Sequence, residues 1–427
     1  MILLIILVKK LVWLVATTMI ILSSIYLSIK FHFPQLKIKT MVKKLFKNHT
    51  HKSLDSFQLL MMNLAGKIGV GSIAGVAISI YVGGIGSIIW MWIISIFSAI
   101  LTYCETILGM KYHIKKKKNV YGGPSYYIKN GLKKPFLGSI YAIIIILSYI
   151  GGFISIQTNT INKSIQEYVT INPVIVGVII SFLAFLVISK GVSKIASVSE
   201  KMVPFMIFLY LLTGILIIIK NINQLPTVFL EMLEQAFCFK SFISGFIPSF
   251  VIGIQRGIFA TEAGLGTGSM AASISNNKAR DEADIQMLGV YITSFLICTI
   301  TAFSITLSNY QAFYVTDLNG IEMIRYIFYQ NFGNIGNIII FISVLLFAFS
   351  TILTGYYYGE TSFQYFGNKC EKLKLWFLNG FTIVNIILGC ILPSELIWNL
   401  VDIFVAILSI INIYAILKLK DDIIREK

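Results

Sequence analysis

The sequence predicts an all-α polytopic membrane protein. Of its 427 residues, 56% are hydrophobic and 13% are charged, whereas a soluble domain carries roughly 25% charged residues. A membrane-spanning helix needs about 20 apolar residues, and a transmembrane β-strand needs only about 10 that alternate with polar ones. The charge-poor stretches of this chain, such as residues 137–152, do not alternate. The composition therefore excludes a water-soluble enzyme, and the pattern predicts helices.

Eleven charge-poor stretches predict eleven transmembrane helices. Residues 1–56 hold the first helix and a basic loop, residues 57–220 and 221–417 hold five helices each, and residues 418–427 form a tail. The eleven predicted helices span residues 11–30, 57–80, 88–110, 137–160, 173–189, 202–219, 246–272, 285–308, 337–358, 376–392 and 397–417.

Lys and Arg are distributed unequally between the two sets of loops that eleven helices define. Loops on one side hold 27 of the 35 Lys and Arg, and loops on the other side hold six. Because cytoplasmic loops accumulate positive charge, this bias predicts a cell-membrane protein with its N-terminus outside and its C-terminus in the cytoplasm. This bias accounts for the net charge of +16, so no nucleic-acid partner is needed to explain it. The expected partner is the lipid bilayer.

Two predicted helices contain glycine clusters that would interrupt them. The second helix has glycines within residues 63–75, and the seventh has them within residues 253–268. Non-helical backbone at membrane depth is tolerated where it lines a cavity or is buried in protein. The interruptions therefore predict a substrate site between these two helices. The alternative, that the glycines only let helices pack closely, does not account for Arg256 and Glu262 beside them.

The positions of the interrupted helices predict an inverted repeat. Each of them opens a group of five helices, and because five is odd, the second group crosses the membrane in the opposite direction. In transporters with such repeats, the N-termini of half-helices face an anionic substrate group and freed carbonyls hold a coupling cation. The arrangement therefore predicts a transporter that works by alternating access.

Five charged residues fall within or beside the predicted helices, where charges are functional candidates by default. Lys67 adjoins the first interruption, and Arg256 and Glu262 flank the second. We interpret these three as coupling or gating candidates, with Arg256 and Glu262 belonging to a gate or to each other. For Glu105 and Asp402, a structural ion pair or an interfacial position explains the charge as well as a substrate role does.

A polar cluster in the fourth predicted helix, Gln157, Thr158 and Asn159, has two interpretations. One of its amides would accept a hydrogen bond from a substrate ammonium. Interhelical hydrogen bonding explains the cluster equally well.

Short motifs follow one another in a fixed order between about residue 57 and residue 417. They are Gly69 to Val76, Gly83-Gly84 with Trp90 to Trp92, Tyr103 to Glu105, Lys111-Tyr112, Gly122 to Tyr127, Arg256 to Gly266, Phe349 to Thr351, and Tyr358 to Glu360. Together they resemble the alanine or glycine:cation symporter family of sodium-coupled amino-acid transporters. The resemblance implies the leucine-transporter-type fold, which has two inverted five-helix repeats, here preceded by one extra helix.

The resemblance also implies how the substrate is held. The substrate would be a small neutral amino acid whose carboxylate binds backbone N–H groups of residues 70–72. Its ammonium would lie near Gln157 and the seventh-helix interruption, and residues 251–253 would shape the side-chain pocket. The implied substrate-binding residues are Val70, Gly71, Ser72, Gln157, Val251, Ile252, Gly253 and Thr261.

A sodium site is implied in the same way. It would use carbonyl oxygens of Ala65, Ile68 and Phe347 and the hydroxyls of Ser350 and Thr351. Residues 347, 350 and 351 share one helix face, so the geometry is feasible. No other cofactor is predicted.

Two residues leave alternatives open. The family usually has Trp where this chain has Ile252, so the pocket would accept a side chain larger than that of alanine. The ammonium of Lys67 would repel a nearby sodium ion by several kcal/mol at an effective dielectric near 20. Proton coupling, or cation-independent exchange with Lys67 replacing the sodium, is therefore the rival to sodium coupling. A membrane enzyme or a channel is more distant, because no nucleophile–base set, metal set or filter segment is visible.

Overall fold

The computed structural model describes residues 2–47, 55–116, 119–238, 245–308, 318, 320–367 and 371–426. Within these residues the protein is helical, as predicted, except for one antiparallel hairpin of β1 (Ile114–Lys116) and β2 (Asn119–Tyr121). The hairpin lies in the loop after the third predicted helix, where the sequence analysis placed no strand.

Eight of the described helical segments are long and apolar enough to cross a membrane, and counting one bent pair gives nine. The chain is therefore a polytopic membrane protein. Two predicted spans are too short to meet this criterion: residues 173–189 form a helix of 16 residues, and residues 246–272 are split in two. The number eleven and the inverted repeat stay predictions. The eight segments are Leu7–Lys30, Ser87–Lys111, Pro135–Gln166, Val192–Lys220, Ala279–Thr306, Gly320–Phe366, Leu373–Ile391 and Ser394–Lys418.

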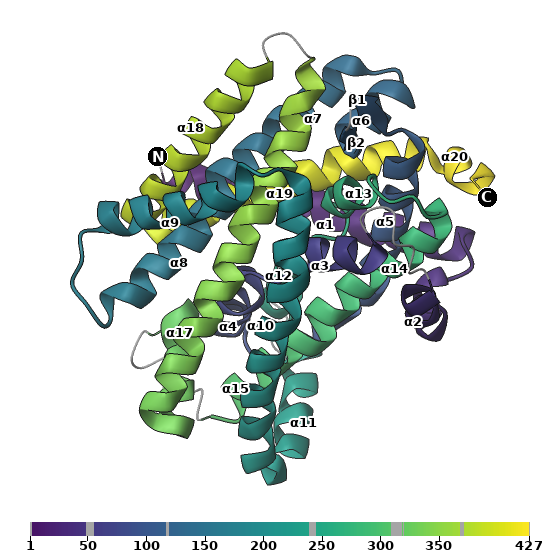
Figure 1. Ribbon diagram of the computed structural model, residues 1–427. Coiled ribbons are helices and arrows are strands. Elements are labelled where there is room, and N and C mark those ends of the chain that lie inside the picture. The colour runs from purple at the N-terminus through teal and green to yellow at the C-terminus, as the bar shows by residue number, and fades with distance from the viewer. Residues whose placement is uncertain are drawn as a thin grey trace.

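The helices follow one another along the chain with few long connections (Figure 1). The α-helices are α1 (Ile2–Lys30), α2 (Ile38–Lys47), α3 (Ser56–Lys67), α4 (Ala74–Gly83), α5 (Ser87–Lys111), α6 (Pro124–Asn130), α7 (Pro135–Ile146), α8 (Ile154–Gln166), α9 (Pro173–Ile188), α10 (Val192–Lys220), α11 (Leu225–Ala236), α12 (Ile247–Thr261), α13 (Thr267–Ala272), α14 (Ala279–Tyr291), α15 (Thr299–Thr306), α17 (Gly320–Phe363), α18 (Glu371–Ile391), α19 (Ser394–Lys418) and α20 (Lys420–Arg425). Short 3-10 turns are η1 (Pro34–Leu36), η2 (Val70–Ser72), η4 (Ile222–Gln224) and η8 (Gln364–Phe366), and π-helical turns are η3 (Leu147–Phe153) and η7 (Ile292–Cys298).

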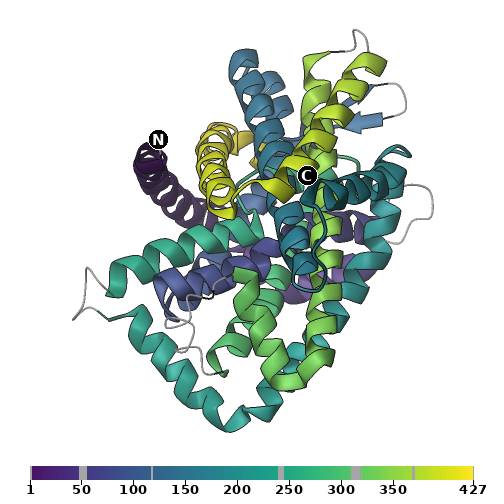
Figure 2. The ribbon, with the colours of Figure 1, turned by 90° about the vertical axis from the view of Figure 1, so that its left-hand side faces the viewer.

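Two pairs of neighbouring helices show how distant parts of the chain are packed together. The first and last long helices, α1 and α19, lie side by side (Figure 2). They run parallel, because Lys9 bonds to Asn399 and Lys30 bonds to Asp421. The helices α8 and α17 run antiparallel, because Ile154 lies beside Gly355 while Tyr168 contacts Phe341.

Contacts between loops gather the predicted cytoplasmic segments at one end of the molecule. The loop after α1 reaches α14 through Lys44 and Asp281, and Arg280 reaches the C-terminal tail at the Ile424 carbonyl. Lys111 also pairs with Asp422 of the tail, at 3.3 Å. The clustering agrees with the bias in Lys and Arg, while the side of the membrane on which this end lies stays a prediction.

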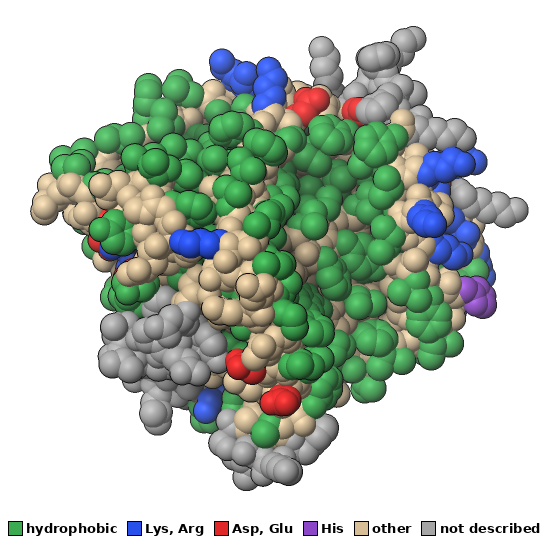
Figure 3. All heavy atoms as spheres, turned by 90° about the horizontal axis from the view of Figure 1, so that it is seen from below, with side chains coloured by type: hydrophobic (Ala, Val, Ile, Leu, Met, Phe, Trp, Pro, Cys, Tyr) green, Lys and Arg blue, Asp and Glu red, His purple; other side chains and the backbone are tan. Residues whose placement is uncertain are grey.

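The surface between the two ends is largely hydrophobic. Figure 3 shows a broad face of apolar side chains with Lys and Arg gathered at its margin. Exposed side chains such as Leu14, Phe182, Phe208 and Trp376 belong to four different helices. Such a surface suits lipid rather than water.

Candidate functional site

The predicted interruption of the second span is present. Helix α3 ends at Lys67, η2 follows, and α4 starts at Ala74, with the two halves bent by 67°. The residues of η2 are buried. A Cβ atom on Gly69 would lie 2.5 Å from the Thr351 hydroxyl oxygen, so the close approach of α17 requires glycine there. We call residues 68–73 the first break.

Side chains from other helices hydrogen-bond to the backbone of the first break. Gln157 of α8 accepts a hydrogen bond from the Val70 N–H at 3.0 Å. Thr301 of α15 donates to the Ser72 carbonyl at 3.3 Å. Gln157 and Thr301 are both buried and uncharged. The structure thus brings Gln157 to the predicted carboxylate-binding segment, and Thr301 is a residue that the sequence analysis missed.

Four of the five predicted sodium ligands bring their oxygen atoms together beside the first break. Thr351 Oγ1 lies 2.8 Å from the Ala65 carbonyl and 2.9 Å from the Phe347 carbonyl. Ser350 Oγ lies 3.0 Å from the Phe347 carbonyl and 3.5 Å from that of Ala65. Ile68, the fifth, directly follows the end of α3. Clustered neutral oxygens are the ligands that hard cations prefer, so this is a candidate cation site.

Aromatic rings cover the first break. A Cβ atom on Gly71 would lie 2.7 Å from the Phe259 ring. Phe259 stacks on Phe153 with centroids 5.0 Å apart and packs against Trp398 at 5.1 Å. Residues from α12, η3 and α19 therefore form a closed layer over the backbone of η2, and we call these three rings the aromatic layer.

The seventh predicted span is also interrupted, over a shorter stretch than the glycines suggested. Glu262, Gly264 and Gly266 have positive φ angles of 52°, 88° and 86°, and they separate α12 from α13. Glu105 of α5 accepts hydrogen bonds from the Gly266 N–H at 2.9 Å and from Asn412 at 3.0 Å. The Asn412 amide also donates to the Gly264 carbonyl. We call residues 262–266 the second break.

Gly253 and Gly257 lie inside α12 and do not interrupt it. A Cβ atom on Gly253 would collide with Ser87 and Trp90 of α5, and one on Gly257 would collide with Ile94. Close helix packing, the alternative weighed for the whole cluster, therefore explains these two glycines.

The remaining predicted substrate residues of the seventh span lie at two levels of α12. Val251 is 38% exposed on the helix surface, and Ile252 contacts Gly83 at the end of α4. Thr261 is buried at the end of α12, where its hydroxyl donates to the Gly257 carbonyl. The role of Val251, Ile252 and Gly253 in a side-chain pocket stays a prediction.

Arg256 pairs with Asp402 of α19, and Glu262 has other neighbours. The Arg256 Nη2 and Asp402 Oδ2 atoms are 2.6 Å apart, and both side chains are buried. Lys9 of α1 lies 3.5 Å from the same carboxylate, and Trp13 donates to the Asp402 carbonyl. The Arg256 guanidinium also lies over the rings of Phe259 and Trp398. An ion pair thus rests directly on the aromatic layer.

Lys67 is buried and has no hydrogen-bond partner among the described residues. Its ammonium points toward Gly289 of α14, where an added Cβ atom would lie 3.5 Å from Nζ. Glu262 and Glu105 are the charged groups that act on it electrostatically. The ammonium is therefore hydrogen-bonded to none of the oxygens of the candidate cation site.

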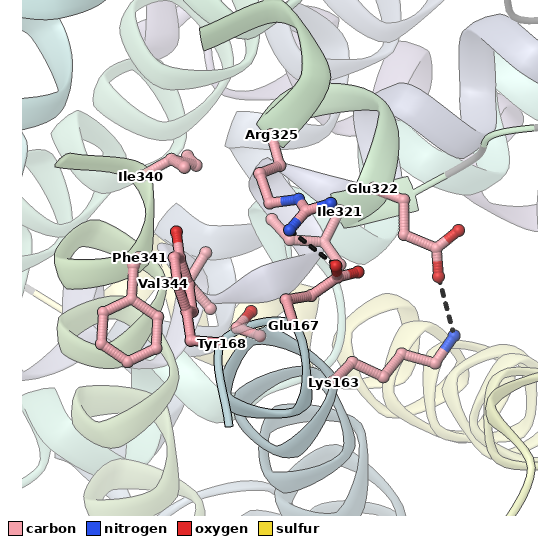
Figure 4. A pocket seen from close by; sticks show the side chains of 10 residues that line it. Lys163, Glu167, Tyr168, Ile321, Glu322, Arg325, Ile340, Phe341 and Val344 are labelled. Carbon is pink, nitrogen blue, oxygen red and sulfur yellow. Dashed lines mark ion pairs between the residues drawn. The ribbon is translucent and has the colours of Figure 1, made fainter. Parts of the chain in front are cut away.

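A separate groove opens between the end of α8 and the start of α17 (Figure 4). It is crossed by two ion pairs, Lys163–Glu322 at 3.5 Å and Arg325–Glu167 at 2.7 Å. The groove joins α8 to the first part of α17, which precedes a kink at Gly333 with φ of 60°. None of the predicted site residues lines it.

The sequence matches a known family along nearly its whole length. A family model described as the sodium:alanine symporter family matches residues 2–427. The chain belongs to the sodium:alanine symporter family. Members of this family are sodium-coupled amino-acid symporters in membranes, so the protein is a transporter and not an enzyme.

Curated relatives cover nearly the whole chain. The Probable sodium/glutamine symporter GlnT of Bacillus subtilis (strain 168) is 32% identical over 96% of this chain and 86% of its own length. The Amino-acid carrier protein AlsT of the same organism is 30% identical, over 92% and 84%. The Sodium/alanine symporter AgcS of Methanococcus maripaludis is 30% identical, over 95% and 91%. The family resemblance seen in the sequence is therefore confirmed.

Proposed function

We propose that the protein is a secondary active transporter that imports a small neutral amino acid, coupled to sodium, by alternating access. The observation that carries the proposal is the first break, whose backbone lies beside both Gln157 and four clustered oxygens. An amino acid and a cation are the two solutes that such a site can hold side by side. Relatives named for alanine and glutamine transport support this substrate class.

The amino acid would occupy the first break. Its carboxylate would accept from backbone N–H groups of residues 70–72, where the Val70 N–H now donates to Gln157. The released Gln157 carbonyl would then accept from the substrate ammonium, with Thr261 near the second break. The exchange replaces a neutral hydrogen bond of about 1 kcal/mol by hydrogen bonds to the two charged ends of the substrate, worth about 1.5–3 kcal/mol each, so substrate binding would drive it.

Sodium would bind the oxygen atoms of Ala65, Ile68, Phe347, Ser350 and Thr351. Carbonyls and hydroxyls supply partial negative charge without a carboxylate, which suits a cation that must be released in each cycle. Since the Lys67 ammonium hydrogen-bonds to none of these oxygens, the geometry favours sodium over a Lys67 that replaces it. Proton coupling and cation-independent exchange become outcomes of the test.

Alternating access would use two pairs of charged residues, one pair on each side of the site. Arg256 with Asp402, resting on the aromatic layer, would close the side that faces the N-terminus of α1. Lys67 and Glu262 would act on the opposite side, where α3 meets the second break. In the proposed orientation the former side is outside the cell membrane and the latter is cytoplasmic.

Transport into liposomes tests the proposal. Purified protein should accumulate labelled L-alanine or L-glutamine when an inward sodium gradient is imposed, and a proton gradient alone should drive little uptake. Uptake driven equally well by a proton gradient would favour proton coupling over sodium coupling. No uptake under either gradient would overturn the transporter proposal for these substrates.

Lys67→Thr separates the coupling alternatives. If sodium binds the oxygen cluster, this variant retains sodium-dependent uptake, although the loss of the cation beside Glu105 and Glu262 lowers the transport rate. If Lys67 replaces sodium in the wild-type protein, the variant should instead gain a sodium dependence that the wild type lacks. The sodium concentration at half-maximal uptake is the quantity to measure in both proteins.

A further inference from the structure

The short helix α2 is strongly amphipathic and lies at the margin of the molecule beside α14 (Figure 1). Residues three or four apart share a helix face, so Ile38, Val42 and Phe46 form one apolar line. Lys39 and Lys43 form a second line directly beside it. The pattern is that of a helix that lies in a membrane interface rather than crossing it.

One side of α2 is fixed to the protein. Met41 and Leu45 are buried, and Lys44 forms ion pairs with Asp281 and Asp284 of α14. Burial lowers the pKa of Lys44, but the hydrogen bonds to these two carboxylates leave it raised above its ordinary value. Lys44 is therefore engaged as a charged anchor, and α2 has a defined orientation.

The apolar line next to this fixed side of α2 is exposed. Ile38, Val42 and Phe46 are 48%, 40% and 68% exposed. Helix α1, which precedes α2 in the chain, also has exposed apolar side chains, including Leu22 and Ile29. Because α1 is one of the helices apolar enough to cross a membrane and ends at Lys30, the apolar line of α2 follows shortly after the end of a membrane-spanning helix.

Lys39 and Lys43 are exposed, and neither has an ion-pair partner among the residues that the structure describes. Their spacing of one helical turn allows both ammonium groups to contact one phosphate. The nearest carboxylates of α14, Asp281 and Asp284, already bind Lys44. Two free cations thus stand beside an apolar line at the margin of a membrane-spanning surface.

We propose that α2 binds an anionic phospholipid, with the headgroup phosphate at Lys39 and Lys43 and an acyl chain along Ile38, Val42 and Phe46. The site goes beyond the transport function and does not depend on it. A soluble phosphate would use the two lysines but not the apolar line, and a zwitterionic lipid would use the apolar line but gain little from the lysines. Only an anionic lipid uses both.

The site is connected to the transport core through α14. Lys44 holds α2 to the start of α14, and Lys67 at the first break points toward Gly289 of the same helix. A lipid that fixes α2 would therefore also restrain the end of α14 that follows the second break. Transport rate is thus a second readout of lipid binding.

Binding of labelled phosphatidylglycerol to the purified full-length protein tests the proposal. The variant Lys39→Gln/Lys43→Gln should bind it roughly thirtyfold more weakly than the wild type, since each of the two lysines near an anionic headgroup contributes on the order of 1 kcal/mol. Phe46→Ser should weaken phosphatidylglycerol and phosphatidylcholine alike. Both variants keep Lys44, so α2 stays anchored, which size-exclusion chromatography and circular dichroism verify.

The matched control is Lys190→Gln/Lys194→Gln, which removes two exposed lysines near the same end of the molecule, away from α2. It should bind phosphatidylglycerol as the wild type does. Equal loss in this control, unchanged binding in Lys39→Gln/Lys43→Gln, or displacement of the lipid by an equal concentration of inorganic phosphate would each overturn the proposal. A photoactivatable phosphatidylglycerol should label residues 38–46, and labelling confined to other segments would overturn it as well.

Discussion

The two breaks differ in the chemistry that stabilises their backbone. At the first break the partners are neutral: the Gln157 amide and the hydroxyl of Thr301. At the second break the Gly266 N–H donates to a carboxylate, that of Glu105, which Asn412 holds in place. Hydrogen bonds to charged groups contribute about 1.5–3 kcal/mol, roughly twice the contribution of neutral ones.

This difference assigns different tasks to the two breaks. Neutral hydrogen-bond partners exchange readily for the polar groups of a ligand. Leaving a buried carboxylate without its hydrogen-bond partners, in contrast, costs much free energy. The first break is therefore suited to binding and release, and the second to holding α12 and α13 in a fixed relation. Lys67 connects them, since it belongs to α3 and acts electrostatically on Glu105 and Glu262.

The largest effect on stability should come from Arg256→Gln. This variant tests whether an ion pair also anchors α12, the helix that precedes the second break. Asp402 would stay buried with Lys9 3.5 Å away as its remaining cation. Breaking a buried pair by removing one partner costs about 3–5 kcal/mol, measurable by thermal unfolding in detergent. The double variant Arg256→Met/Asp402→Leu should recover most of this loss, and a single variant as stable as the wild type would contradict the anchor.

The second-largest effect on stability should distinguish the two breaks, and one variant at each break tests this. Glu105→Ala should reduce the free energy of unfolding by about 3 kcal/mol, because the Gly266 N–H and the Asn412 amide lose a charged acceptor. Gln157→Ala should reduce it by only about 1 kcal/mol but abolish uptake. Unfolding and uptake measured on both proteins provide the test, and equal stability losses would remove the distinction between the breaks.

Sequence reasoning found both breaks, because glycine clusters and charges are rare in membrane helices. It placed the second break too broadly, since a glycine used for packing, such as Gly253, looks the same in sequence as Gly264, which has a positive φ. Four of the five sodium ligands that the family resemblance implied lie together around Thr351, while sodium binding there stays a prediction. The short helices α2 and α11 and the first part of α17 were not predicted as helices, because they lie outside the charge-poor stretches.

The sequence did not indicate which side chains on different helices form hydrogen bonds or ion pairs with one another. Asn412 carried a signal, being an amide in an otherwise apolar stretch, but nothing in its neighbours indicates Glu105. Arg256 was considered with Glu262, six residues away, whereas its partner Asp402 is distant in the chain. Phe259 and Trp398 carried no signal, since aromatic residues make up 13% of the sequence.

A third prediction concerns the aromatic layer over the first break. Gly71→Ala would place a Cβ atom 2.7 Å from the Phe259 ring, whereas Gly75→Ala meets nothing closer than 3.9 Å. Overpacking a buried contact costs about 1–3 kcal/mol, so Gly71→Ala should lower both stability and substrate affinity while Gly75→Ala leaves both near the wild-type values. Equal behaviour of the two alanine variants would show that Phe259 yields easily and that the layer does not define the site.

The smallest effect on stability, and the most specific one on function, should come from the cation oxygens. Thr351→Val removes a hydroxyl that lies within 2.9 Å of two carbonyls, while Thr354→Val removes the hydroxyl one turn further along α17, which donates to the Ser350 carbonyl at 3.1 Å. Both changes delete one buried hydrogen bond of about 1 kcal/mol, so the two proteins should unfold alike.

Sodium should distinguish these two variants. If Thr351 is a ligand, its loss raises the sodium concentration for half-maximal uptake by roughly tenfold, because one ligand is worth on the order of 1.4 kcal/mol. Thr354→Val should leave that concentration unchanged. A uniform shift in both would mean that the hydroxyls of α17 act on sodium only through helix packing, and the first break would then bind the amino acid without an adjoining cation site.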